Sequence, residues 1–406
     1  MPHVVVIGAG AAGLMASIFA AREGARVTLV ERTRTGGKKI VVAGGGRCNV
    51  LPSEVDPARF VTSSSPNLLR RMLLSWPLED QIRFFEDELA IPLALEADTG
   101  KLFPASNRAT DVRDALTRAC RQLGVDARFN TTVTGLAPAA GGWRVETDAG
   151  ALDADRVVVA TGGLSVPKTG SDGFGLAAAE RLGHRMVPTY PALTPLLAEG
   201  SPHADLSGVS LTASVEAPKR KAGVRTRGGF LFTHRGYSGP AVLDVSHLAT
   251  LAREAGERQP VRVAWTDDDA GAWDARLREH GAGTVAGLLR AELPTRLADA
   301  LLAHAAVPID RSRAELRRDE RKRLVAALTA FELPWTGDEG YRKAEVTGGG
   351  VGLAEVDPNT LESRRQPGLH FCGEVLDAFG PIGGYNFMWA WSTGRLAGIA
   401  SAMESS

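Results

Sequence analysis

The chain has 406 residues, 44% of them hydrophobic, and its 47 Lys and Arg residues balance its 47 Asp and Glu residues. This length predicts two or three domains with sizeable cores, and the charge balance gives no global attraction to nucleic acids or acidic membranes. Three widely spaced cysteines without a C-x-x-C pair argue against structural zinc and redox disulfides, and no apolar run approaches the ~20 residues of a membrane span.

The first residues have the order of a dinucleotide-binding unit. An apolar, mostly β-branched strand at Val4–Ile7 leads into a G-x-G-x-x-G turn at Gly8–Gly13, and a helical pattern follows. In such units the glycines allow a tight turn and close approach to a pyrophosphate, which the helix N-terminus attracts. A second strand at Arg26–Val30 ends at Glu31, 18 residues beyond the last glycine, near the spacing of an acid that binds ribose. We therefore predict a bound adenine dinucleotide, either a flavin or a nicotinamide.

The apolar start of the chain is accounted for by this strand rather than by a signal peptide. Together with the unpaired cysteines, it leads us to expect a reduced protein in the cytoplasm.

A glycine-rich loop follows the second strand. Between Gly36 and Asn49 the chain has two adjacent glycines and later three consecutive ones. Backbone of this kind can lie against a flat or anionic ligand, and Lys38, Lys39 and Arg47 are candidates to face a phosphate. The alternative is a glycine-rich surface turn with solvated lysines.

The next part of the chain predicts helices and a small sheet. An amphipathic pattern covers residues 67–90, with a break at Pro77, and a second helix covers residues 111–123. An antiparallel meander is predicted from short alternating strands at 128–134, 143–147 and 151–153.

A second buried strand, Arg156–Val159, runs into Ala160, Thr161 and Gly162. Small residues at a strand end allow a ligand to touch the backbone. This pattern is typical of flavoproteins with two dinucleotide-binding domains, in which the strand end sits over the cofactor.

The composition changes from about residue 190. Prolines and short β-type runs predict a β-rich insertion, and residues 272–331 predict helices. Seven basic residues between Arg311 and Arg323 are interleaved with acids; we interpret them as a solvated helix face, with an RNA-binding patch as the alternative. Gly281–Gly287 has the spacing G-x-G-x-x-x-G and no preceding strand, so we predict a helix start there and no second nucleotide domain.

The end of the chain returns to the predicted cofactor. A strand ends in the pair Gly373–Glu374, and Gly383–Gly384 precede a predicted helix over residues 385–399. A helix N-terminus aimed at an isoalloxazine edge would stabilise negative charge on the reduced ring. The alternative is a capped terminal helix that packs Trp389 and Trp391 into the core, and both interpretations can hold together. Several later segments that return to one ligand favour FAD over a nicotinamide.

Three blocks of the sequence are the most specific. They are Gly-Gly-Gly-Arg-Cys-Asn at 44–49, Phe-Thr-His-x-Gly-x-Ser-Gly-Pro at 232–240 and Gly-Gly-Tyr-Asn at 383–386. Over nearly the whole chain, these and the other blocks resemble the bacterial BaiN-like flavoproteins, also called the YhiN group or aminoacetone-oxidase-type FAD-binding enzymes.

The resemblance implies an α/β fold with a Rossmann-type FAD-binding domain of the glutathione-reductase kind. This domain would cover residues 1–189 plus 346–406. A β-barrel-like, β-rich domain would be inserted at 190–271 plus 332–345, and a helical insertion at 272–331. The resemblance also implies noncovalent FAD, with NAD(P)H as a candidate transient electron donor.

The chain departs from the family pattern at several positions. Ala43 stands where a serine is usual, and Lys101 and Arg108 exchange one cation type for the other. Phe174 replaces an acid and Met388 a glutamine, which makes their neighbourhood less polar.

Candidate cofactor-binding residues come from segments spread over most of the chain. The glycine turn would bind the pyrophosphate and Glu31 the adenosine ribose. The full set of candidates is Gly8, Gly10, Ala11, Ala12, Gly13, Glu31, Arg32, Lys38, Lys39, Gly45, Gly46, Arg47, Cys48, Asn49, Val133, Ala160, Thr161, Gly162, Gly373, Glu374, Gly383, Gly384, Tyr385 and Asn386. We predict no metal site.

The candidate catalytic residues are His234 and Tyr385. Both side chains suit acid–base chemistry, and His234 lies in a glycine-containing loop that could close over a flavin. The alternatives are a structural hydrogen bond for His234 and a packing role for Tyr385.

The sequence therefore predicts an FAD-dependent oxidoreductase that passes a hydride through flavin N5. We expect NAD(P)H-linked reduction, or dehydrogenation, of a small or steroid-like organic molecule. One alternative is a flavin oxidase that acts on a small amine with O₂. Another is a flavin-bearing protein that modifies or binds RNA, suggested by the basic segment 311–323.

Overall fold

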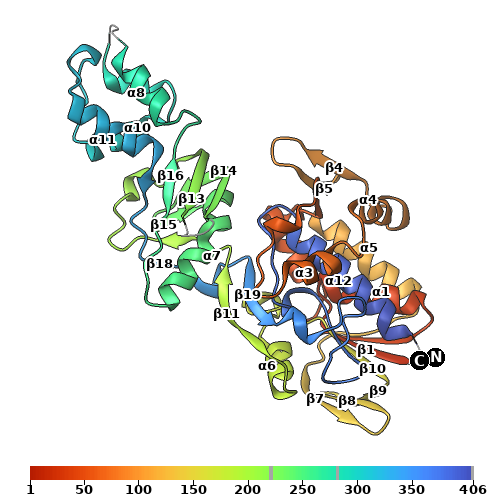
Figure 1. Ribbon diagram of the computed structural model, residues 1–406. Helices are drawn as coiled ribbons and strands as arrows, with labels where there is room; N and C mark the ends of the chain where they lie inside the picture. Colours follow the sequence, from red (N-terminus) through yellow and green to blue (C-terminus); the bar gives the residue numbers. More distant parts are fainter. Residues whose placement is uncertain (219–222, 280–282, 404–406) are drawn as a thin grey trace. The chain divides into compact units, whose positions relative to one another are not determined.

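The computed structural model describes residues 1–218, 223–279 and 283–403 (Figure 1). The chain divides into two compact units, Met1–Tyr190 with Glu345–Ser406, and Pro191–Ala344. Strand β11 (Met186–Ala192) leads out of the first unit, and its partner β19 (Val346–Val351) follows the return. Both the β-rich and the helical parts predicted for the insertion lie in the second unit.

The first unit is built on a five-stranded sheet in the order β20-β10-β1-β2-β6. All four pairings are parallel. Central strands of a parallel sheet are covered on both faces, which explains their unbroken apolar, β-branched sequences. The strands are β1 (His3–Ile7), β2 (Arg26–Val30), β6 (Asp126–Arg128), β10 (Arg156–Val159) and β20 (Leu369–Phe371).

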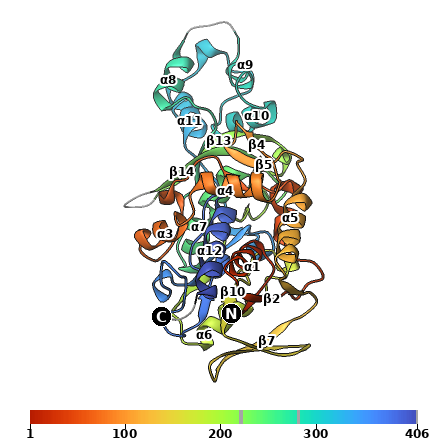
Figure 2. The same cartoon turned by 90° about the vertical axis from the view of Figure 1, so that its right-hand side faces the viewer.

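The first and last helices of the chain pack closely against each other. They are α1 (Ala11–Arg22) and α12 (Tyr385–Ala402), which lie side by side in Figures 1 and 2. A Cβ added at Gly394 or Gly398 would lie 2.4 Å from the carbonyl oxygen of Ala12 or Ala16, respectively. The two glycines therefore let the helix backbones approach each other.

Two small antiparallel sheets and several helices complete the first unit. One sheet has the order β3 (Leu51–Pro52), β5 (Lys101–Pro104), β4 (Leu93–Glu96), and the other β7 (Val133–Ala139), β8 (Gly142–Thr147), β9 (Gly150–Ala154). The helices are α2 (Lys38–Val42), α3 (Pro66–Leu73), α4 (Leu78–Arg83), α5 (Ala109–Gln122) and α6 (Phe174–Arg181).

The predicted break at Pro77 is confirmed, because α3 ends before it and α4 begins after it. The strand predicted over residues 128–134 is wrong in its bounds. The chain leaves β6 at Arg128, bends through Asn130 at φ 52°, and starts β7 only at Val133. The first part of the predicted strand thus belongs to the central sheet and the last part to the meander.

The second unit has a seven-stranded sheet in the order β17-β16-β13-β14-β15-β12-β18. All its pairings are antiparallel. The strands are β12 (Leu196–Leu197), β13 (Ser210–Ala217), β14 (Val224–Phe232), β15 (Gly236–Ser238), β16 (Arg262–Ala264), β17 (Phe331–Glu332) and β18 (Gly337–Asp338). The helices are α7 (Pro240–Glu254), α8 (Ala270–Arg278), α9 (Val285–Arg290), α10 (Thr295–His304) and α11 (Arg318–Thr329).

The glycine-rich segment 281–287 precedes and enters α9. Thr284 caps this helix, because its hydroxyl accepts a 3.1 Å hydrogen bond from the N–H of Gly287. Gly281 and Ala282 lie outside the described residues. Across the described ranges, no helix combines the length and apolar character that crossing a membrane requires.

Candidate cofactor site

The glycine turn between β1 and α1 has two tightly packed positions and one open position. Gly8 has φ +100°, and a Cβ there would lie 2.7 Å from the carbonyl oxygen of Ala160. A Cβ at Gly13 would lie 1.8 Å from the carbonyl oxygen of Gly8, whereas one at Gly10 would meet no described atom within 4 Å. The chain's own packing requires the first and third glycines. The space beside Gly10 fits the close approach of a pyrophosphate.

Glu31 is held against this turn. Its Oε2 accepts a hydrogen bond from the N–H of Ala9 at 2.8 Å. Its Oε1 accepts one from the N–H of Thr33 at 2.8 Å and one from the Thr33 hydroxyl at 2.7 Å. A carboxylate has about four acceptor positions, so Glu31 retains capacity for a ribose hydroxyl. The neighbouring Arg32 forms an ion pair with Asp172.

The Gly44–Asn49 loop has a backbone that glycine makes possible. φ is positive at Gly44 (58°), Gly45 (68°), Gly46 (89°) and Cys48 (61°). A Cβ added at Gly45 or Gly46 would find open space. Asn49 is 8% exposed, and its Oδ1 has no hydrogen-bond partner within the described part of the chain. An unpaired buried acceptor costs about 1–3 kcal/mol, so this loop fits a ligand that brings a hydrogen-bond donor.

Two side chains of this loop, those of Arg47 and Cys48, have surroundings that do not indicate a phosphate ligand. Arg47 donates a 3.0 Å hydrogen bond to Glu96, and its guanidinium lies 4.0 Å from the ring centre of Phe103. Burial raises the pKa of the Cys48 thiol to about 12, so the thiol stays protonated at neutral pH. A protonated thiol suits packing rather than redox chemistry.

Distant segments meet the glycine turn and the glycine-rich loop. A Cβ added at Gly373, two residues after β20 ends, would lie 2.8 Å from the Cβ of Ala12. One added at Gly384, before α12, would lie 2.5 Å from the carbonyl carbon of Leu51. The Cβ position of Gly8 likewise faces Ala160. All these segments follow the carboxyl ends of parallel strands or precede a helix, which is where α/β folds bind ligands.

The side chain of Lys39 is engaged by protein groups at this edge. Its Nζ lies 2.6 Å from Oε2 of Glu374 and 2.6 Å from the hydroxyl of Ser165. Oε1 of Glu374 accepts hydrogen bonds from that hydroxyl at 2.6 Å and from the N–H of Thr347 at 3.0 Å. Burial acts to raise the pKa of Glu374, but Lys39 and these hydrogen bonds outweigh it and lower that pKa below its usual value. Glu374 is therefore ionised and paired with Lys39.

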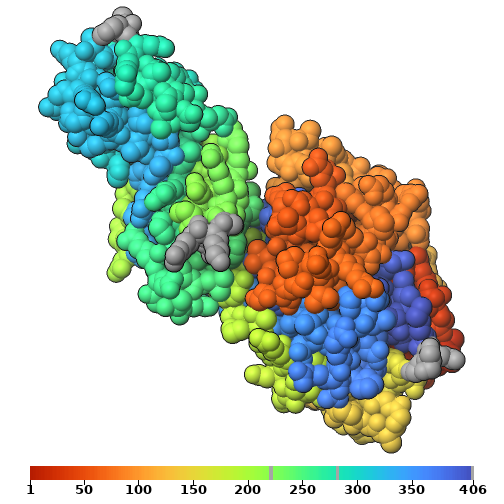
Figure 3. Space-filling view, in the orientation of Figure 1, coloured from red at the N-terminus to blue at the C-terminus, as the bar shows by residue number. Residues whose placement is uncertain are grey.

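Other predicted site residues lie along the same edge. Gly162 follows β10 with φ 71°, and Thr161 precedes it. Val133 begins β7 just after Thr131, whose N–H donates a 3.0 Å hydrogen bond to the carbonyl of Glu31. Lys38 is half-buried at the start of α2. Figure 3 shows segments from the beginning (red to orange) and the end (blue) of the chain on one surface of this unit.

The two catalytic candidates lie in different units. Tyr385 begins α12 in the first unit, and its hydroxyl accepts a 2.5 Å hydrogen bond from Nη1 of Arg59. Asn386, the next residue, binds the backbone N–H and C=O of Gly380, each at 2.9 Å. His234 is exposed between β14 and β15 of the second unit, so its role at the cofactor stays a prediction. Sequence reasoning missed Arg59, which no motif marks.

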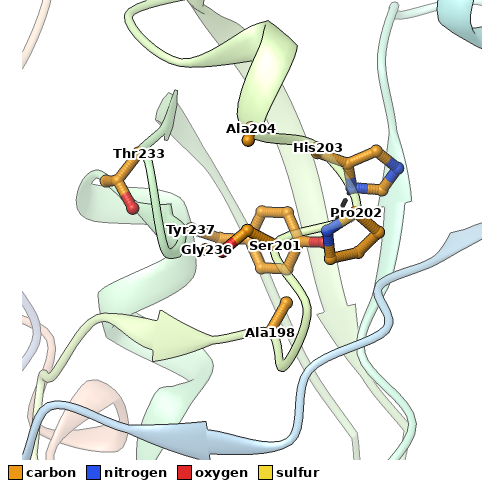
Figure 4. A pocket seen from close by; sticks show the side chains of 8 residues that line it. All are labelled: Ala198, Ser201, Pro202, His203, Ala204, Thr233, Gly236 and Tyr237. Carbon is orange, nitrogen blue, oxygen red and sulfur yellow. Dashed lines mark hydrogen bonds between the residues drawn. The ribbon is translucent and has the colours of Figure 1, made fainter.

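A small pocket lies beside the His234 loop in the second unit (Figure 4). The Tyr237 hydroxyl and Nδ1 of His203 lie 2.8 Å apart in its wall. Burial lowers the pKa of His203 and raises the pKa of Tyr237, so this pair is neutral near pH 7. The pocket encloses no space large enough for a water molecule, so the pair fits a structural hydrogen bond.

Comparison with known proteins decides the family. Residues 2–400 match the family model described as the HI0933-like protein Rossmann domain. The chain belongs to this family. It is 33% identical to a ribosomal RNA dihydrouridine synthase of Escherichia coli K12, over 96% of this chain and 95% of that protein. It is 32% identical to a 3-dehydro-bile acid delta(4,6)-reductase of Clostridium scindens, over 99% of both.

Solved structures share the fold of this HI0933-like chain. The 3-ketosteroid-Δ4-(5α)-dehydrogenase of Rhodococcus jostii RHA1 aligns with a TM-score of 0.52 at 16% identity, over 99% of this chain and 96% of that one. The 3-ketosteroid Δ1-dehydrogenase of Sterolibacterium denitrificans aligns with a TM-score of 0.53 at 13% identity, over 99% and 100%. The predicted resemblance and the α/β fold with a Rossmann-type FAD-binding domain are confirmed. The chain is an FAD-dependent oxidoreductase.

Proposed function

We propose that this protein reduces a carbon–carbon double bond conjugated to a carbonyl group, using FAD and taking electrons from NAD(P)H. The observation that carries the proposal is that relatives matching nearly the whole chain are named for such reductions on two unlike molecules. Dihydrouridine is uridine reduced at a double bond next to a ring carbonyl. A 3-dehydro-Δ4,6 bile acid has its double bonds next to a ketone. The shared bond chemistry therefore supports the proposal more strongly than any one substrate shape.

Bound FAD supplies the hydride-transferring ring, and the protein supplies binding, orientation and electrostatics. Gly8–Gly13 and the N-terminus of α1 would hold the pyrophosphate, and Glu31 the adenosine ribose. The Gly44–Asn49 loop offers open backbone and the unpaired Asn49 acceptor. The N-terminus of α12 would stabilise negative charge at the edge of the ring.

We propose uridine in ribosomal RNA as the first substrate to test. A second relative, from Haemophilus influenzae, has the same name as the Escherichia coli one and is 31% identical over 98% of both chains. A small steroid-like molecule is the second candidate, supported by the Clostridium scindens reductase.

The basic segment 311–323 gives an RNA substrate little support. Glu320 pairs with both Arg311 and Arg317. Arg321 pairs with Asp274, and Arg323 pairs with Asp319. Much of the positive charge is thus neutralised inside the helical part, as expected for a solvated helix face. An RNA substrate would have to be bound largely through other surfaces.

Anaerobic spectroscopy tests the proposed function. We expect NADH or NADPH to bleach the flavin absorbance, and unmodified ribosomal RNA transcribed in vitro to restore it. Mass spectrometry of the RNA should then show a nucleoside heavier than uridine by two hydrogens. A 3-oxo-Δ4,6 steroid is the parallel acceptor. Turnover only with an amine and O₂ would replace the proposal with the oxidase alternative.

A further inference from the structure

We propose that Arg59 positions Tyr385 as the proton donor for this reduction. The inference rests on the proposed function, because it assigns the group that completes the reduced bond. Sequence patterns single out Tyr385 but give no partner for it.

The two side chains make a double contact. Nη1 of Arg59 donates a 2.5 Å hydrogen bond to the phenolic oxygen of Tyr385, and the guanidinium carbon lies 4.7 Å from the centre of the same ring. A phenol that accepts this bond keeps its own O–H proton free for another acceptor. Arg59 therefore fixes the oxygen and leaves its proton available.

The segment that presents Arg59 is anchored to the loop before Tyr385. Val61 and Phe379 exchange two backbone hydrogen bonds, of 2.8 and 3.1 Å. Asp377 accepts a 2.8 Å hydrogen bond from the N–H of Ser63. These contacts hold the backbone around Arg59 in register with the chain that leads into α12.

The ring of Tyr385 is also held from its own side. The ring of Phe60 meets it edge to face, with 5.9 Å between the ring centres. A Cβ added at Gly380 would lie 2.5 Å from the Cβ of Tyr385, so the preceding loop packs tightly on this side chain. Tyr385 directly follows Gly383–Gly384, at the helix N-terminus predicted to face the ring edge. A phenol in a fixed position there is suited to deliver a proton.

The chemistry balances with one proton from the chain. Reduction of a conjugated double bond adds a hydride to the β-carbon and a proton to the α-carbon. The hydride and its electron pair originate from NAD(P)H. The Tyr385 O–H bond breaks, its proton joins the enolate carbon, and its electron pair stays on the phenolate oxygen. Arg59 neutralises this phenolate until solvent returns the proton.

The charges around the phenol explain why Arg59 is needed. Burial raises the pKa of Tyr385, and the carboxylates of Asp56 and Glu54 raise it further. The Arg59 guanidinium opposes them and lowers that pKa. Lys101 approaches the same loop, with its Cε 3.9 Å from the Cβ position of Gly383. Removal of the Arg59 charge should therefore make Tyr385 a weaker acid.

Four variants of the full-length, FAD-loaded protein test the inference. Arg59→Gln removes the charge, Arg59→Lys restores it without the planar fork, and Tyr385→Phe removes the proton. Arg71→Gln changes an exposed arginine on α3 and serves as the matched control. Flavin absorbance first establishes that each variant is loaded.

The kinetic measurement separates reduction of the flavin from reduction of the acceptor. We expect Arg59→Gln and Tyr385→Phe to slow acceptor reduction by roughly 10²-fold, the lower range for loss of a general acid. Flavin bleaching by NAD(P)H should stay within about twofold of wild type, as should both steps in Arg71→Gln. The alkaline limb of the pH profile should move to higher pH in Arg59→Gln and back in Arg59→Lys.

A second measurement needs no turnover. The four tyrosines can be replaced by fluorotyrosine and observed by ¹⁹F NMR, with Tyr385→Phe identifying the Tyr385 resonance. Its titration midpoint should rise in Arg59→Gln and partly return in Arg59→Lys, and should not move in Arg71→Gln.

The outcomes distinguish two kinds of failure. Acceptor reduction at the wild-type rate in Tyr385→Phe, or an unmoved midpoint in Arg59→Gln, would overturn the inference and leave the proposed function standing. A wild-type protein that reduces no conjugated acceptor would overturn the proposed function, and the catalytic role of Tyr385 with it, whatever the NMR shows.

Discussion

Lys39 and Glu374 form an ion pair of 2.6 Å although they lie 335 positions apart in the sequence. Their side chains are only 28% and 17% exposed, respectively. The hydroxyl of Ser165 binds both partners, and the N–H of Thr347 binds the carboxylate. The pair joins the segment after β2, the segment after β10, strand β19 and the segment after β20. It therefore connects four segments at the edge of the sheet where the candidate cofactor site lies.

Removing one partner of this pair should destabilise the first unit. Lys39→Met leaves Glu374 charged and buried, and we expect the free energy of unfolding to fall by about 2–4 kcal/mol. Glu374→Gln in the same chain removes the uncompensated charge, so the double variant should recover part of the loss. Urea denaturation measures both. Arg144→Gln, in an exposed pair with Glu146, is the control and should cost under about 1 kcal/mol. Equal losses in Lys39→Met and the control would contradict a role for burial.

The free energy of unfolding should fall as the pH rises, because Asp377 binds its proton more tightly in the folded state than in the unfolded state. This side chain is 3% exposed, and burial raises its pKa to about 6. The folded state then binds a proton that the unfolded state has released, so stability is fully present below the ordinary pKa of about 4 and falls between about pH 4 and 6. Asp377→Asn should remove this fall and exceed wild type by about 3 kcal/mol at pH 7, with little difference at pH 4. Thermal unfolding across this pH range measures the effect, and parallel curves for the two proteins would exclude it.

The fingerprint glycines should respond differently to substitution. Gly10→Val places its side chain in space that the described chain leaves open, so the apoprotein should fold normally but lose the yellow colour of bound FAD. Gly13→Ala places a Cβ 1.8 Å from the carbonyl oxygen of Gly8, so it should destabilise the fold itself. Circular dichroism reports whether each variant folds, and flavin absorbance reports whether it binds FAD, so the two measurements together separate these effects. A yellow Gly10→Val variant with full flavin occupancy would contradict the assignment of the site.

Asn49 should matter for the cofactor and not for the fold. Its buried Oδ1 is unpaired within the described chain, so Asn49→Leu removes a polar group that lacks a partner. The apoprotein should be as stable as wild type or more stable. FAD affinity should fall by roughly 3–10-fold, the equivalent of one hydrogen bond. Titration of apoprotein with FAD, followed by flavin fluorescence, measures this change, and an unaltered affinity would place the ligand elsewhere.

Local patterns predict the central fold of this chain well. The conformations of the fingerprint at Gly8–Gly13 and of the strand Arg156–Val159 are determined largely by residues that are adjacent in the sequence. Gly8 and Gly13 are needed where the strand and helix must meet closely, and only glycine fits those positions. Such requirements are visible in the sequence because they act over a few residues.

Side-chain partners were not predictable in the same way. Arg47 and Lys39 were candidates for a phosphate, yet their charges meet Glu96 and Glu374, respectively. Arg59 carries no motif at all, and only the tertiary structure brings it to Tyr385. Ion pairs between distant segments depend on the folded geometry, and a charged residue has the same local sequence signal whichever partner it finds.

The contact between α1 and α12, made through Gly394 and Gly398, has a consequence for synthesis on the ribosome. Residues 191–344 are contiguous, so this unit is complete while the last helix is still untranslated. The glycine turn and α1 emerge before this unit, but their packing partner α12 emerges after it, which leaves α1 exposed to wrong partners during elongation. The inserted unit is thus free to fold cotranslationally, whereas the Rossmann unit becomes competent to capture its flavin only after α12 has been translated.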